Sequence, residues 1–304
     1  MSRTSETAYS AVASFRNEGS KAIGILCAIV IVVLFAGFTL ISRLGFSSAL
    51  KLPDIAALRF GIAGVILLPI FLKRGLSGLP WYRAAGLAFA GGLGFALFAY
   101  TGFYLAPASH GAVLLHGTLP LSTFAIVYLT SREKTKLAQT IGFSIIALGI
   151  ATMAWDSLSG ATTRQLVGDG ALLLASISWS SYGVAVKRLG LVPLHAASIV
   201  AFFSMCFFFP VYLMLPGNAL FLAGWRDLLI QGVFQGVFLG VVSIFVYTRA
   251  VASLGAKETA LFTAAVPCIT TAAAIPLLSE MPGVAVIIGV VLVTAGMVIA
   301  MRAS

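Results

Sequence analysis

The chain has 304 residues, of which 60% are hydrophobic and 9% are charged, and its mean hydropathy is +1.06. A soluble domain needs much more polar surface, so this composition excludes one and indicates a protein of the lipid bilayer. The formal net charge of +10 comes from basic residues that lie mostly between apolar runs.

Almost everything after Lys21 falls into apolar runs of about 17–25 residues, the length that crosses a hydrocarbon core of roughly 30 Å. Inside lipid each run must pair its own backbone polar groups, so we expect the runs to be helices. The sequence therefore predicts an all-α integral membrane protein with ten transmembrane helices. The runs cover 23–42, 55–72, 81–104, 108–129, 137–155, 169–186, 194–215, 228–250, 258–278 and 284–301.

The basic residues are distributed unequally between the two sides of these predicted helices. Fourteen of the 19 Lys and Arg residues fall on the side that holds both chain ends, four fall on the opposite side, and Arg59 lies within a run. Cytoplasmic loops of membrane proteins are enriched in Lys and Arg, so this bias predicts that both termini are cytoplasmic. The basic charge is thus a topology signal, and we expect no nucleic acid partner.

Part of the first half recurs in the second half at an offset of 147 residues. This offset carries Tyr100 onto Tyr247, Pro120 onto Pro267 and Glu133 onto Glu280. It also carries Gly142 onto Gly289 and Gly149 onto Gly296. Each copy contains five runs, an odd number, so the two copies must cross the membrane in opposite directions. Many secondary transporters have this plan, with the solute site near the midplane where the halves meet.

The repeat divides the chain into two units of five spans. We expect a short disordered cytoplasmic tail over 1–20, a first repeat over 21–155, a linker over 156–168 and a second repeat over 169–302. The linker stretch is rich in Ser, Thr and Gly, which is typical of a connection between units.

Several short motifs resemble the drug/metabolite transporter superfamily, specifically its ten-span type with two EamA-like repeats. The motifs are Pro53 followed by Arg59-Phe60, ASHGA at 108–112 followed by Pro120 and Glu133, GAKETA at 255–260 followed by Pro267 and Glu280, and GDG at 168–170 followed by Ser178-Trp179. The resemblance implies a central cavity lined by the first, third, fourth, sixth, eighth and ninth spans, and export of amino acids, other metabolites or toxic compounds. The chain departs from the family at His110, where a small residue is more usual.

His116 lies near the middle of the fourth run, about ten residues from either end. Ionisable groups at that depth are costly and usually face the bundle interior or a water-filled cavity. We therefore assign His116 to the wall of a solute cavity, where it could also titrate. The alternative is a neutral core histidine bonded to a neighbouring carbonyl. His110, near the outer end of the same run, is expected at the interface.

Aromatic side chains at mid-depth form a second group of candidates, because interfacial anchoring does not explain them there. Trp179 and Tyr182 lie on the sixth run, and Phe35 and Phe38 lie on the first. Their rings suit an apolar or aromatic solute held between them, and the alternative is ordinary packing.

Polar side chains on other runs complete the predicted cavity. Gln231 and Gln235 share one face of the eighth run, where amides need partners. Thr263 on the ninth run is the repeat counterpart of His116, although a threonine can also bond to its own helix. Arg59 lies about 9 Å into the second run, so we expect its side chain to snorkel outward as a structural anchor.

Matched residues in the two copies are candidates for movement and gating. Pro120 and Pro267 interrupt the fourth and ninth runs, and each is expected to kink its helix. Matched breaks point to the binding region of a transporter, although a kink can also only set the shape. Tyr100 and Tyr247 are candidate gate residues, and interfacial tyrosines are the alternative.

The three cysteines, Cys27, Cys206 and Cys268, all lie in apolar runs and have no metal-ligand spacing. We expect buried free thiols, no metal and no cofactor. Metalloprotease and serine-hydrolase motifs are missing from the sequence, so we expect no catalytic residues and no enzyme activity.

The sequence therefore predicts a secondary transporter that exports small organic solutes, such as amino acids, related metabolites or drugs, across the bacterial inner membrane by alternating access. Its partners are then the lipid bilayer and a small-molecule substrate. A passive channel or facilitator for small metabolites is the alternative. The substrate, the driving ion and the oligomeric state stay open.

Overall fold

A computed structural model gives the fold. It describes the backbone of 3–46, 48–107, 110–131, 136–158, 162–216, 219–220, 222–278, 281 and 283–302. Side chains are described from Lys21 onward within these ranges, except for those of 153, 154, 156–158 and 301. Glu133 and Glu280 of the predicted repeat, and Ala108 and Ser109 of the family motif, lie outside the described residues.

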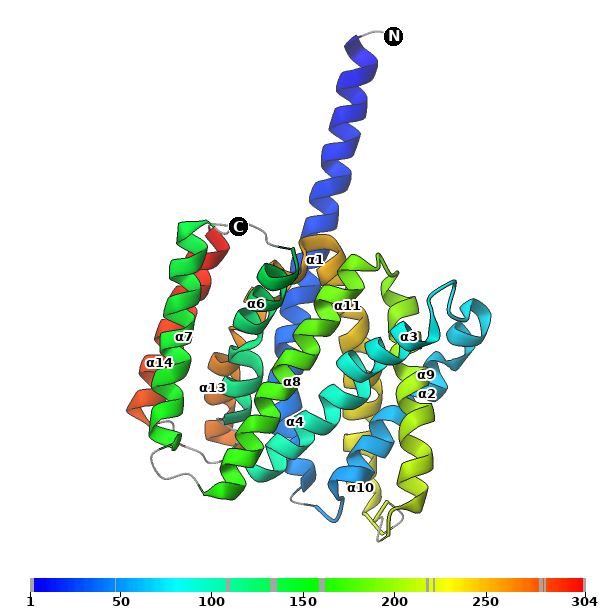
Figure 1. The fold of residues 1–304 in the computed structure, drawn as a ribbon, viewed down its shortest axis with the longest axis vertical. Coiled ribbons are helices and arrows are strands. Elements are labelled where there is room, and N and C mark those ends of the chain that lie inside the picture. Colours follow the sequence, from blue (N-terminus) through cyan, green and yellow to red (C-terminus); the bar gives the residue numbers. More distant parts are fainter. Residues whose placement is uncertain are drawn as a thin grey trace.

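The described chain is built from helices connected by short segments (Figure 1). The first half contains α1 (Arg3–Phe46), α2 (Leu52–Arg74), α3 (Trp81–Ala88), the π-helix η1 (Phe89–Leu93), α4 (Gly94–Leu105), the π-helix η2 (Gly111–Gly117), α6 (Leu119–Ser131) and α7 (Leu137–Leu158). The second half contains α8 (Thr163–Arg188), α9 (Pro193–Met214), α10 (Trp225–Gln231), the π-helix η3 (Gly232–Val242), α11 (Ser243–Leu254), α12 (Ala256–Thr263), α13 (Val266–Leu278) and α14 (Val284–Arg302).

The all-helical fold class is confirmed in the described residues. Seven continuous helices are long and apolar enough to cross a membrane, and two shorter apolar helices belong to α7 and α14. The remaining candidate, α8, has 26 residues but carries buried polar groups, including Asp169, Ser176 and Ser180, which lower its hydropathy. The fold thus provides the helices for ten spans, while the number that cross the bilayer stays a prediction.

Two boundaries differ from the expected ones. Helix α1 begins at Arg3, so the disordered tail expected over 1–20 is wrong from that residue on; no proline interrupts the chain between Arg3 and the first span. The expected linker over 156–168 is too long, because α7 continues to Leu158 and α8 begins at Thr163. Thr162 and Gln165 form a capping box that starts α8 early: the Thr162 hydroxyl accepts from the Gln165 N–H, and the Gln165 side chain accepts from the Thr162 N–H.

The two halves are related by inversion, and the glycines of α7 and α14 show this most directly. A Cβ at Gly142 would lie 2.7 Å from the Gly296 carbonyl oxygen, and a Cβ at Gly149 would lie 2.9 Å from that of Gly289. Position rises along α7 as it falls along α14, so the two helices are antiparallel. Because α14 is the repeat counterpart of α7, the two copies run in opposite directions, as the odd number of spans predicts. Gly142 thus contacts Gly296, the repeat counterpart of Gly149, and Gly149 contacts Gly289, the repeat counterpart of Gly142.

The second and seventh helices, α2 and α9, form another antiparallel pair of repeat counterparts. Phe71 stacks on Phe202 with ring centroids 3.8 Å apart, and Phe60 lies 5.2 Å from Phe208. The remaining contacts also exchange between halves, since α4 packs against α8 while α1 packs against α11. Helices α1 and α8 therefore occupy equivalent central positions.

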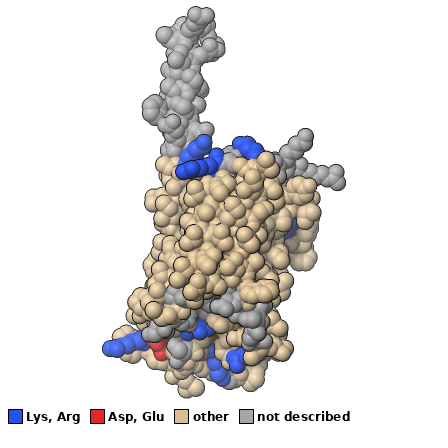
Figure 2. Space-filling view, turned by 90° about the vertical axis from the view of Figure 1, so that its left-hand side faces the viewer, with Lys and Arg blue, Asp and Glu red and all other residues tan. Residues whose placement is uncertain are grey.

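The bundle has two ends. At the upper end in Figure 1, α1 enters and α14 finishes, and at the lower end α1 finishes and α8 begins. On the face drawn in Figure 2, Lys and Arg gather toward these ends, and the band between them is almost free of charged side chains. That band is the surface expected against hydrocarbon.

The cysteines do not lie as expected. Cys206 is exposed and the other two are partly buried, although all three are free thiols. Cys206 is on the side of α9 that carries other exposed apolar residues, such as Phe207 and Val211, and this side faces outward from the bundle.

The close contact of α7 with α14 predicts a specific sensitivity to added volume. Gly142→Ala places a methyl group 2.7 Å from backbone atoms of Gly296 and Ala300, so we expect a loss of about 1–3 kcal/mol in stability, measured as a lower unfolding temperature in detergent. Gly86→Ala is the matched control, since a Cβ there meets nothing within 4 Å, and it should leave that temperature unchanged or slightly raised. Equal unfolding temperatures for the two variants would contradict the helix pairing.

Candidate functional site

The centre of the bundle is an aromatic cluster around Trp179 of α8. The indole lies 4.5 Å from Phe95, 4.9 Å from Tyr247, and 5.4 Å from both Phe35 and Tyr182, measured between ring centroids. All five side chains are buried. They come from both repeats, so the predicted candidates Trp179, Tyr182 and Phe35 meet where the halves join.

His116 joins this cluster at the end of η2. Its ring lies 5.0 Å from the Phe35 ring, and it is completely buried. Neither imidazole nitrogen makes a hydrogen bond of standard geometry in the described part of the chain, but the ring interacts with the backbone of Gly111. The predicted alternative, a core histidine bonded to a carbonyl, therefore has a candidate partner in Gly111. The indole Nε1 of Trp179 is also buried without a hydrogen bond of standard geometry among the described residues, and its polar contact is the Tyr247 hydroxyl.

Tyr182 and Tyr247 pack tightly beside the indole because glycines face them. A Cβ at Gly91 would lie 2.5 Å from the Tyr182 ring, and a Cβ at Gly183 would lie 2.5 Å from the Tyr247 hydroxyl. Tyr182 also hydrogen-bonds Thr248 through the two hydroxyls at 2.7 Å. Tyr247 is 1% exposed, so it is not an interfacial tyrosine.

Arg59 of α2 is the main residue that sequence reasoning misplaced. Its side chain is 2% exposed, and its guanidinium carbon lies 5.3 Å from the Phe38 ring and 5.7 Å from the Phe95 ring. The expectation that it snorkels outward is wrong, because α2 packs against α9 and η3 and turns Arg59 inward. The signal was present in the sequence, since a charge within an apolar run is a functional hypothesis by default.

The two glutamines form a network on the lower side of Arg59. The Tyr100 hydroxyl donates to Gln235 Oε1 at 2.9 Å, and Gln235 Nε2 donates to Ser42 Oγ at 3.0 Å and to Gln231 Oε1 at 3.2 Å. Gln231 Nε2 donates to the Ile41 carbonyl at 2.8 Å. The network joins α1 and α4 to α10 and η3. It places Tyr100 inside the bundle instead of at the interface.

The helices of the fourth and ninth predicted spans, η2 with α6 and α12 with α13, break immediately before their matched prolines. A turn at Thr118 separates η2 from α6, whose second residue is Pro120. Similarly, a turn at 264–265 separates α12 from α13, whose second residue is Pro267. Thr263 lies at the second break, and its hydroxyl donates to the Ala260 carbonyl of its own helix at 2.6 Å.

Small hydroxyl side chains connect the first break to α8. Thr118 Oγ1 donates to Ser176 Oγ at 2.7 Å, and Thr123 Oγ1 donates to Ser180 Oγ at 3.0 Å. The serines lower the hydropathy of α8, and these bonds explain why such polar side chains lie inside the bundle, facing α6. The first-repeat helix that carries His116 is thereby tied to the helix that carries Trp179.

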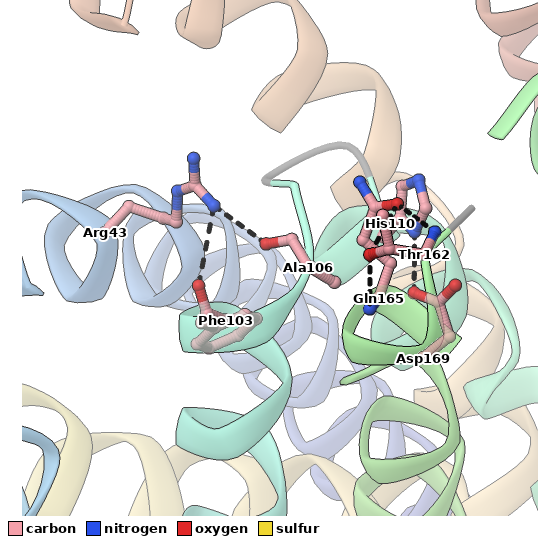
Figure 3. A network of polar contacts seen from close by, with 7 residues as sticks. All are labelled: Arg43, Phe103, Ala106, His110, Thr162, Gln165 and Asp169. Atoms are coloured by element: carbon pink, nitrogen blue, oxygen red, sulfur yellow. Dashed lines mark hydrogen bonds and ion pairs between the residues drawn. The ribbon is translucent and has the colours of Figure 1, made fainter. Parts of the chain in front are cut away.

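A buried acid–base pair, His110 with Asp169, ties η2 to α8 at the lower end (Figure 3). The two atoms His110 Nδ1 and Asp169 Oδ1 are 2.6 Å apart, and both residues are 6% exposed. The second carboxylate oxygen is buried without a partner in the described part of the chain. His110 therefore lies at the end of the bundle, near the expected interface, but it is buried between helices. Beside the pair, Arg43 donates to the Ala106 carbonyl at 2.7 Å and so anchors the segment that leads to His110.

The upper end is hollow instead. A cavity of about 440 Å³ opens there between α6, α8 and the start of α12. Its polar lining includes four basic residues and one acid: Lys136, Lys187, Arg188, Lys257 and Glu258. Hydrogen bonds thus join the helices at the lower end, and a cavity lies at the upper end, with the aromatic cluster between.

Comparisons with known proteins agree with this architecture. The model of the EamA-like transporter family matches twice, over residues 22–155 and 166–302. An uncharacterised transporter of Clostridium kluyveri is 26% identical over 199 residues, which cover 62% of this chain and 62% of that protein. The matched region is therefore less than two thirds of that relative's length.

A solved crystal structure of a protein shares the fold, with a TM-score of 0.63 at 20% identity, and the match covers 94% of this chain and 97% of that chain. Since the family model matches almost all of both halves, the chain is a multi-pass membrane protein that belongs to the EamA-like transporter family.

Proposed function

We propose that this chain is a secondary transporter that exports small organic solutes, such as amino acids or related metabolites, by alternating access. The observation that carries the proposal is the group of unsatisfied polar atoms at the centre of the bundle. His116, Trp179 and Arg59 each bury a nitrogen that makes no hydrogen bond of standard geometry in the described residues, and their polar contacts are the Gly111 backbone, Tyr247 and Tyr100, respectively. All three surround the phenylalanines of α1 and α4.

Buried polar atoms in native proteins are nearly always hydrogen-bonded, and each exception needs an explanation. Here the exceptions gather between the two repeats, where transporters of inverted-repeat design bind their solutes. A bound solute supplies the missing partners and places its apolar part against Phe35, Phe38 and Trp179. The cost of leaving these nitrogens unpaired when the site is empty then becomes part of the binding energy.

The two ends of the bundle support alternating access. At the lower end, the pair of His110 with Asp169 holds α8 against the first repeat, and the hydrogen bond of Tyr100 with Gln235 does the same for η3. At the upper end, the cavity admits solute. The helix breaks before Pro120 and Pro267 provide matched places where the two repeats bend as access changes sides.

The orientation follows from the placement of basic residues. With both termini in the cytoplasm of a bacterial cell, the upper cavity faces the cytoplasm and the lower pair faces outward, so solute enters the open end and leaves on the other side. The dense ring contacts at the centre favour a carrier over a passive channel, because no continuous opening is needed in any one state.

Trp179→Ala should weaken transport by about tenfold or more, because each aromatic contact contributes about 0.5–1.5 kcal/mol beyond the burial itself. The measurement is counterflow of a labelled solute in proteoliposomes, using a solute found by thermal-shift screening of amino acids, nucleosides and cationic dyes. Trp81→Ala is the control, since Trp81 is 68% exposed, and it should retain wild-type counterflow. Unsaturable flux or unitary currents from the wild type would instead support a channel.

Asp169→Asn should loosen the lower end. Losing a charged hydrogen bond costs about 1.5–3 kcal/mol, which shifts the closed population by roughly tenfold or more. A cysteine introduced at Ala106, which is 2% exposed, should then react faster with a membrane-impermeant maleimide added from outside, in a background without native cysteines. Thr162→Ala removes only the exposed cap of the same helix and should leave the labelling rate unchanged. Equal labelling rates in all three proteins would exclude this pair as a closure.

A further inference from the structure

Arg59 is a buried cation without a counter-charge in the described part of the chain. Its Nη1 is inaccessible and makes no hydrogen bond of standard geometry, the guanidinium interacts with the uncharged Tyr100 hydroxyl, and none of the described carboxylates lies within ion-pair distance of it. A guanidinium stays charged at any physiological pH, so neutralisation by proton loss is not open to it. An unpaired charge away from water is strongly unfavourable, so a ligand of opposite charge is expected to bind favourably beside it.

The nearest acidic residue on the same helix is already committed elsewhere. Asp54 accepts from the Tyr212 hydroxyl at 2.8 Å and from the Ala219 N–H at 3.1 Å through Oδ1, and from the Lys51 N–H at 2.8 Å through Oδ2. These bonds fix both carboxylate oxygens against α9 and the helix start. Asp54 is therefore a structural group that joins α2 to α9, and it does not balance Arg59.

The groups around Arg59 are uncharged. The Tyr100 hydroxyl, which donates to Gln235, interacts with the guanidinium, and the rings of Phe38 and Phe95 lie beside it. Phe95 separates the guanidinium from the indole, at 5.7 Å from one and 4.5 Å from the other. A buried cation whose contacts in the described residues are a hydroxyl and aromatic rings complements a ligand that is negative in charge.

We propose that Arg59 is the anion receptor of the solute site and that the transported solute is an organic anion, a carboxylate on an aromatic or aliphatic body. The inference rests on the proposed transport function and narrows the small organic solutes proposed there to carboxylates that lack an ammonium group, in place of amino acids. The guanidinium binds the carboxylate, which matches its planar set of donors. The rings of Phe38, Phe95 and Trp179 hold the apolar body.

Two further features agree with an anion. The upper cavity carries four basic residues against one acid, so its field concentrates anions at the open end. A zwitterion such as an amino acid also needs an acceptor for its ammonium group, and the described residues place no free carboxylate beside Arg59. A simple carboxylate therefore fits the site better than a zwitterion of the same size.

The test is binding to the full-length protein in detergent, which does not depend on transport. The probes are phenylacetate and hexanoate, each compared with its neutral amide, together with the zwitterion phenylalanine. The thermal unfolding temperature and quenching of tryptophan fluorescence report binding. We expect the acids to stabilise the wild type, with affinities about tenfold or more above those of the amides and of phenylalanine.

The variant arm uses Arg59→Gln, which keeps donors but loses the charge, and Arg59→Lys, which keeps the charge but loses the planar fork. The first should lose the preference for acids over amides, and the second should retain part of it. Arg226→Gln, at an exposed arginine against Trp225, is the control and should bind as the wild type does.

Three results would overturn the proposal: amides that bind as well as the acids, no binding of either acid to the wild type, or an Arg59→Gln protein that keeps the acid preference. The comparison of acid with amide on the wild type decides the question even if both Arg59 variants fail to fold. If the acids bind but no counterflow is found in proteoliposomes, the anion site stands and the proposed transport function fails.

Discussion

Hydrocarbon offers no hydrogen bonds, so each polar atom inside a membrane bundle must find its partner within the protein, and this constraint organises the whole molecule. Most of the buried polar groups satisfy it by joining helices. Gln235 connects η3 to Tyr100 and Ser42. Ser176 and Ser180 connect α8 to Thr118 and Thr123, just before and within α6. The polar side chains that lower the hydropathy of α8 are therefore the ones that place it at the centre.

The exceptions stand out against this background. At the centre, Arg59, His116 and Trp179 bury nitrogens that make no hydrogen bond of standard geometry in the described chain. Their neighbours are aromatic rings, which offer only weak attraction, of about 0.5–2 kcal/mol for a cation over a ring. The fold supports this unfavourable arrangement through close helix contacts elsewhere, above all the reciprocal glycines of α7 and α14. A rigid frame that tolerates unpaired donors at one place is what a solute site requires.

Sequence reasoning succeeded where a single residue pattern decides the outcome. Run length gave the helices, and the matched Gly142 and Gly289 gave the inversion, because an odd number of spans leaves no other topology. It failed where orientation around a helix decides. Whether Arg59 points to lipid or to the interior depends on α9 and η3, which are far away in the sequence. Likewise His110 and Asp169 are 59 positions apart, and only the packing of η2 on α8 brings them together.

Comparison of the two copies separates frame from site. Where the copies keep the same residue, as at Pro120 and Pro267 or at the glycines of α7 and α14, the residue breaks or packs a helix, and this must happen equally in both repeats if they exchange roles during a cycle. Where the copies differ, equivalent backbone positions carry side chains of different chemistry. His116 is buried and makes no hydrogen bond of standard geometry in the described chain, whereas its counterpart Thr263 bonds to its own helix.

A solute has no twofold symmetry, so the groups that recognise it are expected to differ between the copies. The helix breaks and close helix contacts stay alike, and the unpaired donors arise from individual positions. Arg59 fits this division, because it lies on the inner side of α2, whereas α9, the repeat counterpart of α2, contains no Lys, Arg, Asp or Glu. The charge at the centre is therefore present in one copy alone, as expected of a residue that serves the solute and not the fold.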